Sequence, residues 1–177
     1  MSYKVVLTDH VFPEDSLVSE VKRLAGVDLE VHHVKDEDRL IEITHDADVV
    51  LVEMAQITRR VIEKMERCRL IGRHGVGYDT LDVEAATDHG IMVCNVTDYC
   101  TSEVADQAMA MLLGLSRSLL RADQEVRSGG WDVYAACSGN RRLDGQVLGL
   151  IGLGNIGRAV ARRAQAFGIE VIAYDPY

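Results

Sequence analysis

Three glycines near the end of the sequence, Gly152, Gly154 and Gly157, stand at the spacing GxGxxG. An apolar run at 147–151 comes before them, and a stretch with apolar residues at helical spacing follows. In this setting the first glycine permits a tight turn, the second lets the backbone approach a pyrophosphate, and the third lets helix and strand pack closely. The motif is weak when it stands alone, but between a strand and a helix it predicts a dinucleotide-binding turn.

Residues on either side of this turn complete the predicted site. The backbone amides of Asn155 and Ile156 are expected to point at the phosphates from the helix N-terminus, where the dipole favours an anion. The next strand, EVIAY at 170–174, ends at Asp175, 18 residues after Gly157. An acid at about this distance accepts a hydrogen bond from the adenosine 2′-hydroxyl, and its charge repels a 2′-phosphate. The sequence therefore predicts NAD(H) in preference to NADP(H).

A plainer interpretation of the turn stays open. The glycines can serve only to pack helix against strand, with no nucleotide bound. The three arginines of the helix, Arg158, Arg162 and Arg163, are interpreted as its solvent-facing side rather than as a phosphate site.

The elements that position this turn are predicted from hydrophobic periodicity. Short β-rich runs alternate with helical stretches in the first half of the chain, which implies a parallel sheet covered on both faces. Strands are expected at 4–8, 29–34, 47–52, 69–72 and 91–95, and helices at 14–25, 36–46, about 58–67 and from about 81. A long helix, capped by Thr101 or Ser102 and stopped at 128–130, then leads through a polar connector at 131–145. Met109 and Met111 are interpreted as core residues of this helix.

Composition and charge narrow the classes of function. The 177 residues carry a net charge of −9, and residues 1–90, with 11 bases and 19 acids, hold −8 of it. This acidity does not suit nucleic acid or an anionic membrane as a partner. No stretch approaches the ~20 apolar residues that a membrane helix needs, and the first apolar run is too short for a signal peptide. A cytoplasmic protein is expected.

The cysteines predict no metal site. Cys68, Cys94, Cys100 and Cys137 form no CxxC pair and no zinc-type spacing. Reduced thiols are the expected state in a cytoplasmic protein. Cys94 ends an apolar run and is predicted to lie in the core, whereas Cys100 lies in a polar turn.

The chain resembles the D-isomer-specific 2-hydroxyacid dehydrogenases, and within them the C-terminal-binding-protein-like branch. Three stretches carry the resemblance: GRHGVGYDTLDVEAATDHGIMVCNV, TSEVADQAMAMLLGLSRSLL and LDGQVLGLIGLGNIGRAVARRAQAFGIEVIAYDPY. They run from about residue 72 to 177, and residues 1–71 fit the family's N-terminal substrate domain in pattern only. The resemblance implies an α/β protein with a flavodoxin-like parallel-sheet substrate lobe at 1–100. The first half of a Rossmann NAD-binding lobe follows at 101–177.

The resemblance also implies where the substrate binds. The family's RxGxGxD loop is present as Arg73, Gly75, Gly77 and Asp79, and in relatives its backbone amides bind the substrate carboxylate. Glycines expose amides, and exposed amides hold anions, so the residue types fit this role. The amide of Val76 is expected to take part, and Arg73 to add positive charge. The alternative is a strand-to-helix turn whose arginine pairs with a surface acid.

Two further features follow from the resemblance. Val104 falls at a family position near the cofactor, although it equally suits a core position. The long helix and its connector form the dimer contact in relatives, so a homodimer is expected.

The residues that carry the family's chemistry do not map onto this chain. In the family an arginine orients the oxo acid, a histidine moves the proton and a glutamate tunes the histidine. All three lie downstream of the ribose-binding acid, and the sequence ends two residues after that acid. His74, in the glycine loop, has no obvious glutamate partner and is not expected to replace the histidine.

The resemblance therefore predicts NAD(H)-dependent oxidoreduction of a small D-2-hydroxy acid or 2-oxo acid, with this chain as the N-terminal part of the enzyme. One alternative is a non-catalytic, dimeric, NAD(H)-sensing binding module of corepressor type. Another is an inactive truncated fragment. A free chain of 177 residues with an open apolar sheet edge is expected to be poorly soluble or oligomeric.

Overall fold

The computed structural model describes residues 2–11 and 17–177. The chain divides into two compact units, Met1–Thr97 and Asp98–Tyr177. No helix in the described residues is long and apolar enough to cross a membrane.

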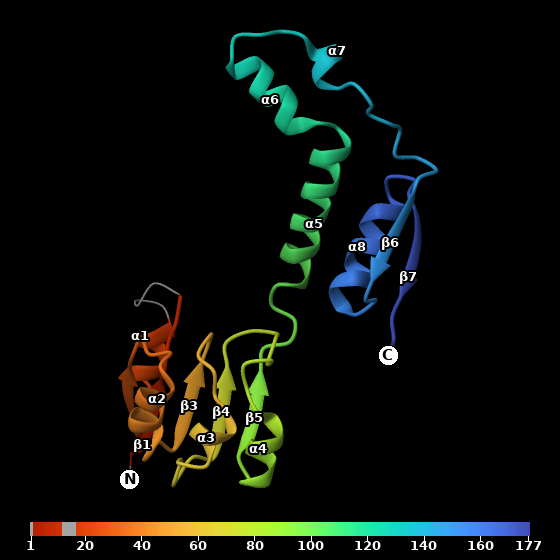
Figure 1. The fold of residues 1–177 in the computed structure, drawn as a ribbon. Coiled ribbons are helices and arrows are strands. Elements are labelled where there is room, and N and C mark those ends of the chain that lie inside the picture. Colours follow the sequence, from red (N-terminus) through yellow and green to blue (C-terminus); the bar gives the residue numbers. More distant parts are fainter. Residues whose placement is uncertain (1, 12–16) are drawn as a thin grey trace. The chain divides into compact units, whose positions relative to one another are not determined.

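The first unit is built on a five-stranded parallel sheet (Figure 1). Its strands are β1 (Tyr3–Leu7), β2 (Val27–Val31), β3 (Val49–Val52), β4 (Leu70–Arg73) and β5 (Met92–Asn95). They lie in the order β2-β1-β3-β4-β5, which is the doubly wound flavodoxin-like order. The predicted α/β class and parallel sheet are confirmed. All the carboxyl ends of these strands meet at one edge, where ligands bind in sheets of this kind.

Four short helices connect the strands: α1 (Leu17–Lys22), α2 (Glu37–Thr44), α3 (Arg59–Ile62) and α4 (Val83–Asp88). Side-chain caps begin α2, α3 and α4, because the carboxylates of Asp36 and Asp82 and the Thr58 hydroxyl each accept a hydrogen bond from a backbone N–H in the first turn. The predicted helix at 14–25 begins within residues 12–16, which lie outside the described part of the chain.

Helix α3 is shorter than the sequence predicts. After Ile62 the chain tightens into hydrogen bonds between residues three apart. The backbone N–H of Glu66 then donates to the carbonyl oxygen of His45, at 2.9 Å. This contact is made with a residue far away in sequence, so the local periodicity that favours a helix to 67 does not reveal it.

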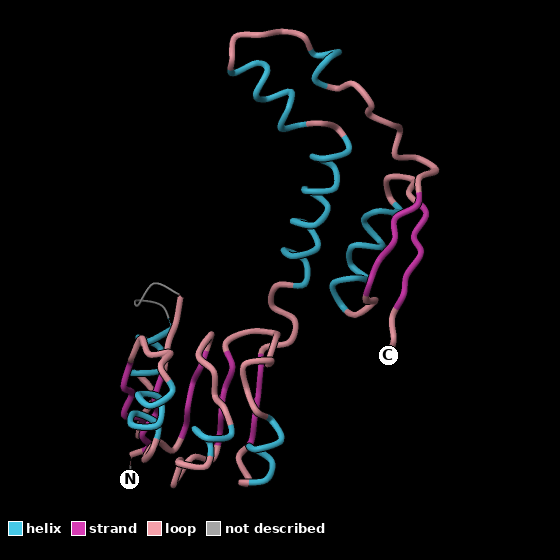
Figure 2. The backbone as a smooth tube through the Cα atoms, viewed as in Figure 1, coloured by secondary structure: helices cyan, strands magenta, loops and turns pink. Residues whose placement is uncertain are grey.

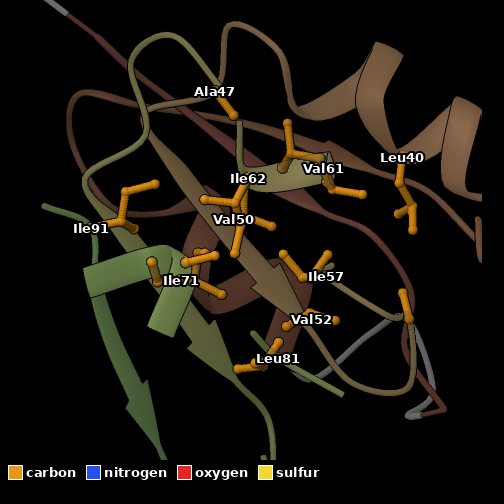
Figure 3. Packing of buried hydrophobic residues seen from close by; sticks show 14 of the residues in the cluster. Leu40, Ala47, Val50, Val52, Ile57, Val61, Ile62, Ile71, Leu81 and Ile91 are labelled. Carbon is orange, nitrogen blue, oxygen red and sulfur yellow. The ribbon is translucent and has the colours of Figure 1, made fainter. Parts of the chain in front are cut away.

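The core of the first unit fills the space between the sheet and its helices. Figure 3 shows residues from β3, β4, α2 and α3 meeting there. Val50, Val52 and Ile71 on the central strands are fully buried. The prediction for Cys94 is wrong, because Cys94 is exposed on the edge strand β5. Alternation along β5 turns Val93 toward the core and Cys94 to the other face.

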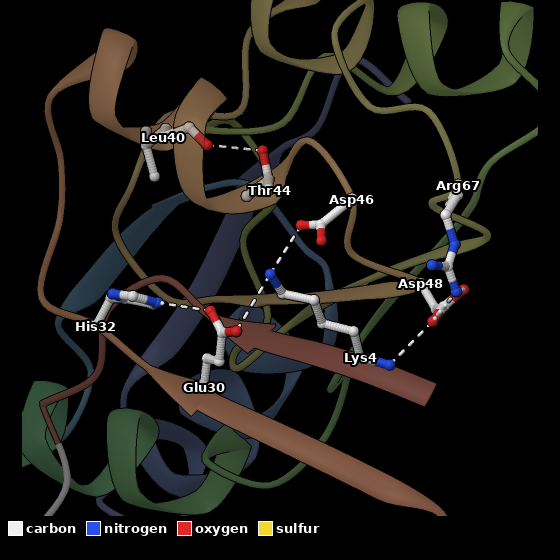
Figure 4. Close-up of polar contacts among 8 residues, drawn as sticks. All are labelled: Lys4, Glu30, His32, Leu40, Thr44, Asp46, Asp48 and Arg67. Carbon is white, nitrogen blue, oxygen red and sulfur yellow. Dashed lines mark hydrogen bonds and ion pairs between the residues drawn. The ribbon is translucent and has the colours of Figure 1, made fainter. Parts of the chain in front are cut away.

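Charged side chains tie β1 to β2 and to the turns on either side of β3 (Figure 4). The Lys4 ammonium lies 2.7 Å from Asp46 Oδ1 and 3.1 Å from Glu30 Oε1. The backbone N–H of Lys4 donates to Asp48 Oδ2 at 2.9 Å, and Asp48 Oδ1 accepts from Arg67 at 2.8 Å. Part of the acidity of the first half is thus matched by local bases within the fold.

The second unit holds helices and a pair of parallel strands (Figure 2). Its elements are α5 (Thr101–Ser116), α6 (Leu119–Arg127), α7 (Val133–Ala136), β6 (Val147–Ile151), α8 (Asn155–Gln165) and β7 (Glu170–Tyr174). Helix α5 packs on α8 through small and apolar residues, among them Ala105, Met109, Ala159 and Ala164. The strand–turn–helix–strand order predicted around the glycines is confirmed.

The long helix predicted from residue 102 is interrupted. Ser118 has a φ of 54° in the left-handed region and separates α5 from α6. Its hydroxyl donates to Asn140 Oδ1 at 2.6 Å. Met111, predicted to be core, is 56% exposed. Only the side of α5 that contacts α8 is buried within this unit, and Met111 does not lie on it.

Candidate functional site

The glycine turn between β6 and α8 has the geometry that its sequence predicts. Gly152 has a φ of 91°, which favours glycine, and its N–H donates to the Tyr174 carbonyl oxygen at 2.8 Å. A Cβ at position 157 would collide with the carbonyl oxygen of Gly152. A Cβ at Gly154 would meet nothing within 4 Å. The fold itself therefore requires glycine at 152 and 157, whereas glycine at 154 leaves space in front of the turn.

The first turn of α8 presents unpaired amides beside this space. Gly154 is the N-cap and offers no side chain to the helix end. In the part of the chain that the structure describes, the N–H groups of Asn155 and Ile156 have no acceptor, and the first helical bond runs from Arg158 N–H to the Gly154 carbonyl. Free N–H groups and the helix dipole together favour an anion here. This arrangement fits the pyrophosphate of a dinucleotide.

Asp175 follows β7 and reaches back to the turn. Its Oδ2 accepts a hydrogen bond from the Leu153 N–H at 2.6 Å, and its Oδ1 accepts one from the Tyr177 N–H at 3.0 Å. These backbone hydrogen bonds, with that from Leu153 as the larger influence, lower the pKa of Asp175 below its usual range. The exposed carboxylate is therefore ionised at neutral pH. Each oxygen still has a lone pair that can accept a ribose hydroxyl.

The arginines of α8 and Val104 of α5 are exposed to different degrees. Arg163 is not simply solvent-facing, because its Nε lies 2.6 Å from Asp106 Oδ1 and joins α8 to α5. Arg158 and Arg162 are exposed, as expected. Val104 is 41% exposed on α5 and lies outside the core of this unit.

The loop after β4 holds the predicted substrate-binding residues of the first unit. Two hydrogen bonds from the end of β5 fix it: the Val96 N–H donates to the Gly75 carbonyl at 3.1 Å, and Asn95 Nδ2 donates to the Val76 carbonyl at 2.7 Å. The N–H groups of Val76 and Gly77 have no acceptor within the described residues. The loop thus offers two adjacent free amides, as the carboxylate-binding prediction requires.

Arg73 folds over the same loop. The guanidinium lies in the space that a Cβ at position 75 would occupy. Its Nε is buried without a hydrogen-bond partner in residues 2–11 and 17–177. Within the same residues Arg73 forms no ion pair, so the alternative in which it pairs with a surface acid gains no support. A buried donor left unpaired is costly, and an anion at this loop would relieve that cost.

A polar cluster after β1 and β3 could not be found by motif matching. Asp9, two residues after β1, accepts hydrogen bonds from the backbone N–H groups of Glu53, Met54 and Ala55 at 3.2, 2.8 and 3.2 Å. It also accepts one from the Thr8 hydroxyl at 2.9 Å. Burial, the largest single influence, raises the pKa of Asp9, but these four bonds together lower it below its ordinary value. The only signal in the sequence is an acid placed directly after a buried strand.

His74 faces this cluster. Burial lowers its pKa, and the neighbouring Glu53 and Asp9 act in the opposite direction. Glu53 is thus the acid with the larger influence on the pKa of His74. The expectation that His74 does not replace the family's histidine stays a prediction. The rings of His10 and His33 meet at the same sheet edge, with centroids 4.5 Å apart.

The candidate residues fall into two groups, one in each unit. The substrate group is Arg73, Gly75, Val76 and Gly77, and the cofactor group is Val104, Gly152, Gly154, Asn155, Ile156, Gly157 and Asp175.

A cavity of about 300 Å³ in the second unit lies between residues 115–121 and 138–146, and none of the candidate residues lines it. No group of three or more metal-ligating side chains occurs among the described residues.

Comparison with known proteins establishes the family. The family model for the D-isomer specific 2-hydroxyacid dehydrogenase catalytic domain matches residues 5–172. The chain therefore belongs to the D-isomer-specific 2-hydroxyacid dehydrogenase family. A D-3-phosphoglycerate dehydrogenase from Methanocaldococcus jannaschii is 39% identical over 175 residues, which is 98% of this chain and 32% of that relative.

Solved structures agree with this assignment. The NAD-dependent formate dehydrogenase from Staphylococcus aureus, in complex with NAD, has a TM-score of 0.81 at 28% identity, over 98% of this chain and 56% of that one. An acyclic imino acid reductase in complex with NADPH and D-Arg has a TM-score of 0.83 at 28% identity, over 96% and 55%. The chain thus spans just over half the length of these structures and about a third of that phosphoglycerate dehydrogenase.

Proposed function

We propose that this chain is part of an enzyme that transfers a hydride between NAD(H) and a small D-2-hydroxy acid or 2-oxo acid. The observation that carries the proposal is the turn at 152–157, with its free amides and its bond to Asp175. The nicotinamide cofactor, when bound, supplies the hydride acceptor or donor. The family's catalytic arginine, glutamate and histidine belong, in this proposal, to the part of the enzyme outside these 177 residues.

The two units divide the binding work in this proposal. The first unit is the N-terminal part of a substrate-binding domain, in which the amides of Val76 and Gly77 hold the carboxylate and Arg73 adds charge. The second unit is the first half of an NAD-binding domain. There the turn holds the pyrophosphate, Asp175 accepts the ribose hydroxyl, and Val104 contributes an apolar contact to the cofactor.

The charge of Asp175 supports NAD(H) over NADP(H). A solved neighbour holds NADPH and another holds NAD, so the fold accommodates either cofactor. The low pKa of Asp175 keeps a negative charge where a 2′-phosphate would lie. We infer that this charge, rather than the shape of the turn, sets the preference.

Dimer formation through the second unit is the third part of the proposal. The segment 111–134 exposes large apolar side chains: Met111, Leu115, Leu119, Leu120, Val126, Trp131, Val133 and Tyr134. Exposed apolar surface of this kind marks an interaction site. A second copy of the chain is the proposed occupant, in line with the dimer contact implied by the resemblance.

A corepressor-type NAD(H)-sensing module is the competing function. It depends on the C-terminal-binding-protein-like branch, which stays a prediction, since the relatives and structures described above are enzymes by name. Binding of NADH, followed by its fluorescence, tests the cofactor site in either case. The intact mass of the protein from its native source then separates an enzyme fragment from a short module. Absence of NADH binding would overturn the proposal.

A further inference from the structure

Asn95 is not one of the predicted binding residues, but its side chain contacts one of them, Val76. It is the last residue of β5 and pairs in register with Arg73, the last residue of β4. Its side-chain amide crosses from β5 to the neighbouring loop and donates to the Val76 carbonyl at 2.7 Å. Asn95 is partly buried, so its hydrogen bond is better shielded from solvent than a hydrogen bond on an exposed surface.

The geometry of the peptide group gives this bond a consequence. The carbonyl of Val76 and the N–H of Gly77 belong to one planar trans peptide and point in opposite directions. Holding the carbonyl against Asn95 therefore turns the Gly77 N–H away from β5. In the same way, the bond from Val96 N–H to the Gly75 carbonyl directs the Val76 N–H.

The hydrogen bond from Asn95 restrains the 76–77 peptide, and loss of the donor removes this restraint on the Gly77 amide. Rotation of the 76–77 peptide changes ψ of Val76 and φ of Gly77, and glycine accepts either sign of φ at little cost. A Cβ at Gly77 would meet only Asp79 Oδ2, at 3.4 Å, so there is open space beside this residue. The Asn95 side chain is the described contact that selects one orientation of this peptide.

We propose that Asn95 is a positioning residue for substrate binding, which sets the direction of the Gly77 amide that receives the substrate carboxylate. The inference rests on the proposed function. Asn95 itself does not touch the substrate; it fixes the carbonyl on the far side of the peptide. Removal of its donor is expected to weaken carboxylate binding through disorder of one amide, while the nucleotide turn in the other unit is unaffected.

The test uses the ¹⁵N-labelled chain and oxamate, an unreactive analogue of a 2-oxo acid, in the presence of NADH. The amide signals of Val76 and Gly77 are followed for the wild type, for the isosteric variant Asn95→Asp and for Asn95→Ala. Residual dipolar couplings report the direction of the Gly77 N–H relative to β4 and β5. Asp98→Asn, at an exposed neighbouring acid, is the matched control.

We expect oxamate binding to weaken at least tenfold in both Asn95 variants and to stay unchanged in the control. The dipolar coupling of Gly77 is expected to change in the variants, while the affinity for NADH does not. Asn95→Asp preserves volume, and thermal unfolding checks that each variant is folded. If Asn95→Asp does not fold, Asn95→Ala decides the question by the same two measurements.

The same test separates failure of this inference from failure of the proposed function. Wild-type Val76 and Gly77 signals that ignore oxamate would overturn both, because the loop would then not be a carboxylate site. Signals that respond equally in the wild type and the Asn95 variants, with an unchanged Gly77 coupling, would overturn the role of Asn95 alone.

Discussion

The Asp175 carboxylate accepts a hydrogen bond from the Leu153 N–H at 2.6 Å, and this bond joins the end of β7 to the middle of the glycine turn. One charged group thus has two tasks. It braces the turn from inside, and in the proposed cofactor site it places a negative charge beside the ribose. The two tasks can be separated by substitution, because an amide keeps an acceptor for Leu153 but removes the charge.

Asp175→Asn is expected to reduce the preference for NADH over NADPH by about tenfold, which corresponds to about 1.4 kcal/mol. The physical reason is the loss of repulsion toward the 2′-phosphate. Fluorescence titration with the two cofactors measures the ratio of their dissociation constants. Glu170→Gln removes an exposed acid at the start of β7 and serves as the control. An unchanged ratio in Asp175→Asn would show that this acid does not select the cofactor.

The three glycines of the turn are expected to respond differently to added side chains. Gly154→Val fills open space and should leave stability nearly unchanged while NADH binding falls at least tenfold, since the side chain blocks the approach of the pyrophosphate. Gly157→Val collides with the Gly152 carbonyl and should cost about 1–3 kcal/mol of unfolding free energy. Urea unfolding and NADH titration of both variants make the comparison.

Gly114→Ala is a suitable control for this pair. Gly114 lies within α5, and a Cβ there would meet nothing within 4 Å. Alanine in a helix is favoured over glycine, so stability should rise by about 0.5–1 kcal/mol with no change in NADH affinity. Equal loss of NADH binding and stability in Gly154→Val would mean that position 154 serves packing and not the nucleotide.

The parts of the fold that local pattern determines were predictable from the sequence. The glycine turn is one, since its strand, helix and acid lie within about 30 residues and each follows its own periodicity. The break at Ser118 is not, because the hydroxyl that accompanies it bonds to Asn140, 22 residues later. The early end of α3 has the same origin, in a bond from Glu66 to His45.

The candidate site divides in the same way. A glycine-rich loop after β4 was visible in the sequence, whereas its role in binding the substrate came from the resemblance to the family and stays a prediction. The hydrogen bond from Asn95 to Val76 was not predictable, because it depends on the register that places β5 beside β4. The exposure of Cys94 depends on the same register, because the alternation along an edge strand decides which residue faces the core.

Asp9 is expected to make folding stability depend on acidic pH. Its pKa in the fold lies below the ordinary value of 3.8, so the unfolded chain binds more protons than the folded chain as pH falls through 3.8. The stabilisation from Asp9 is complete above that pH and is lost as pH falls through the lower, folded pKa. Asp9→Asn removes acceptors from the 53–55 loop and should cost about 2 kcal/mol at pH 7.

Urea unfolding of the wild type and Asp9→Asn between pH 7 and pH 2.5 checks this expectation. The difference between them should be constant down to about pH 4 and shrink below it. Asp28→Asn, on the exposed side of β2, should show no such difference. A gap between wild type and Asp9→Asn that stays constant to pH 2.5 would mean that the charge of Asp9 does not stabilise the loop.

Leu115→Arg is expected to disrupt the proposed dimer. Leu115 is 76% exposed within the second unit, so a change there should leave the unit's own core intact. A charge buried without a partner in an apolar interface costs several kcal/mol, enough to shift a dimer to monomer at micromolar concentration. Sedimentation velocity measures the change.

Leu24→Arg, at an exposed leucine of the first unit, should leave the dimer as it is. If the wild type sediments as a monomer, or if Leu115→Arg remains dimeric, the apolar residues of α5 and α6 do not form the interface.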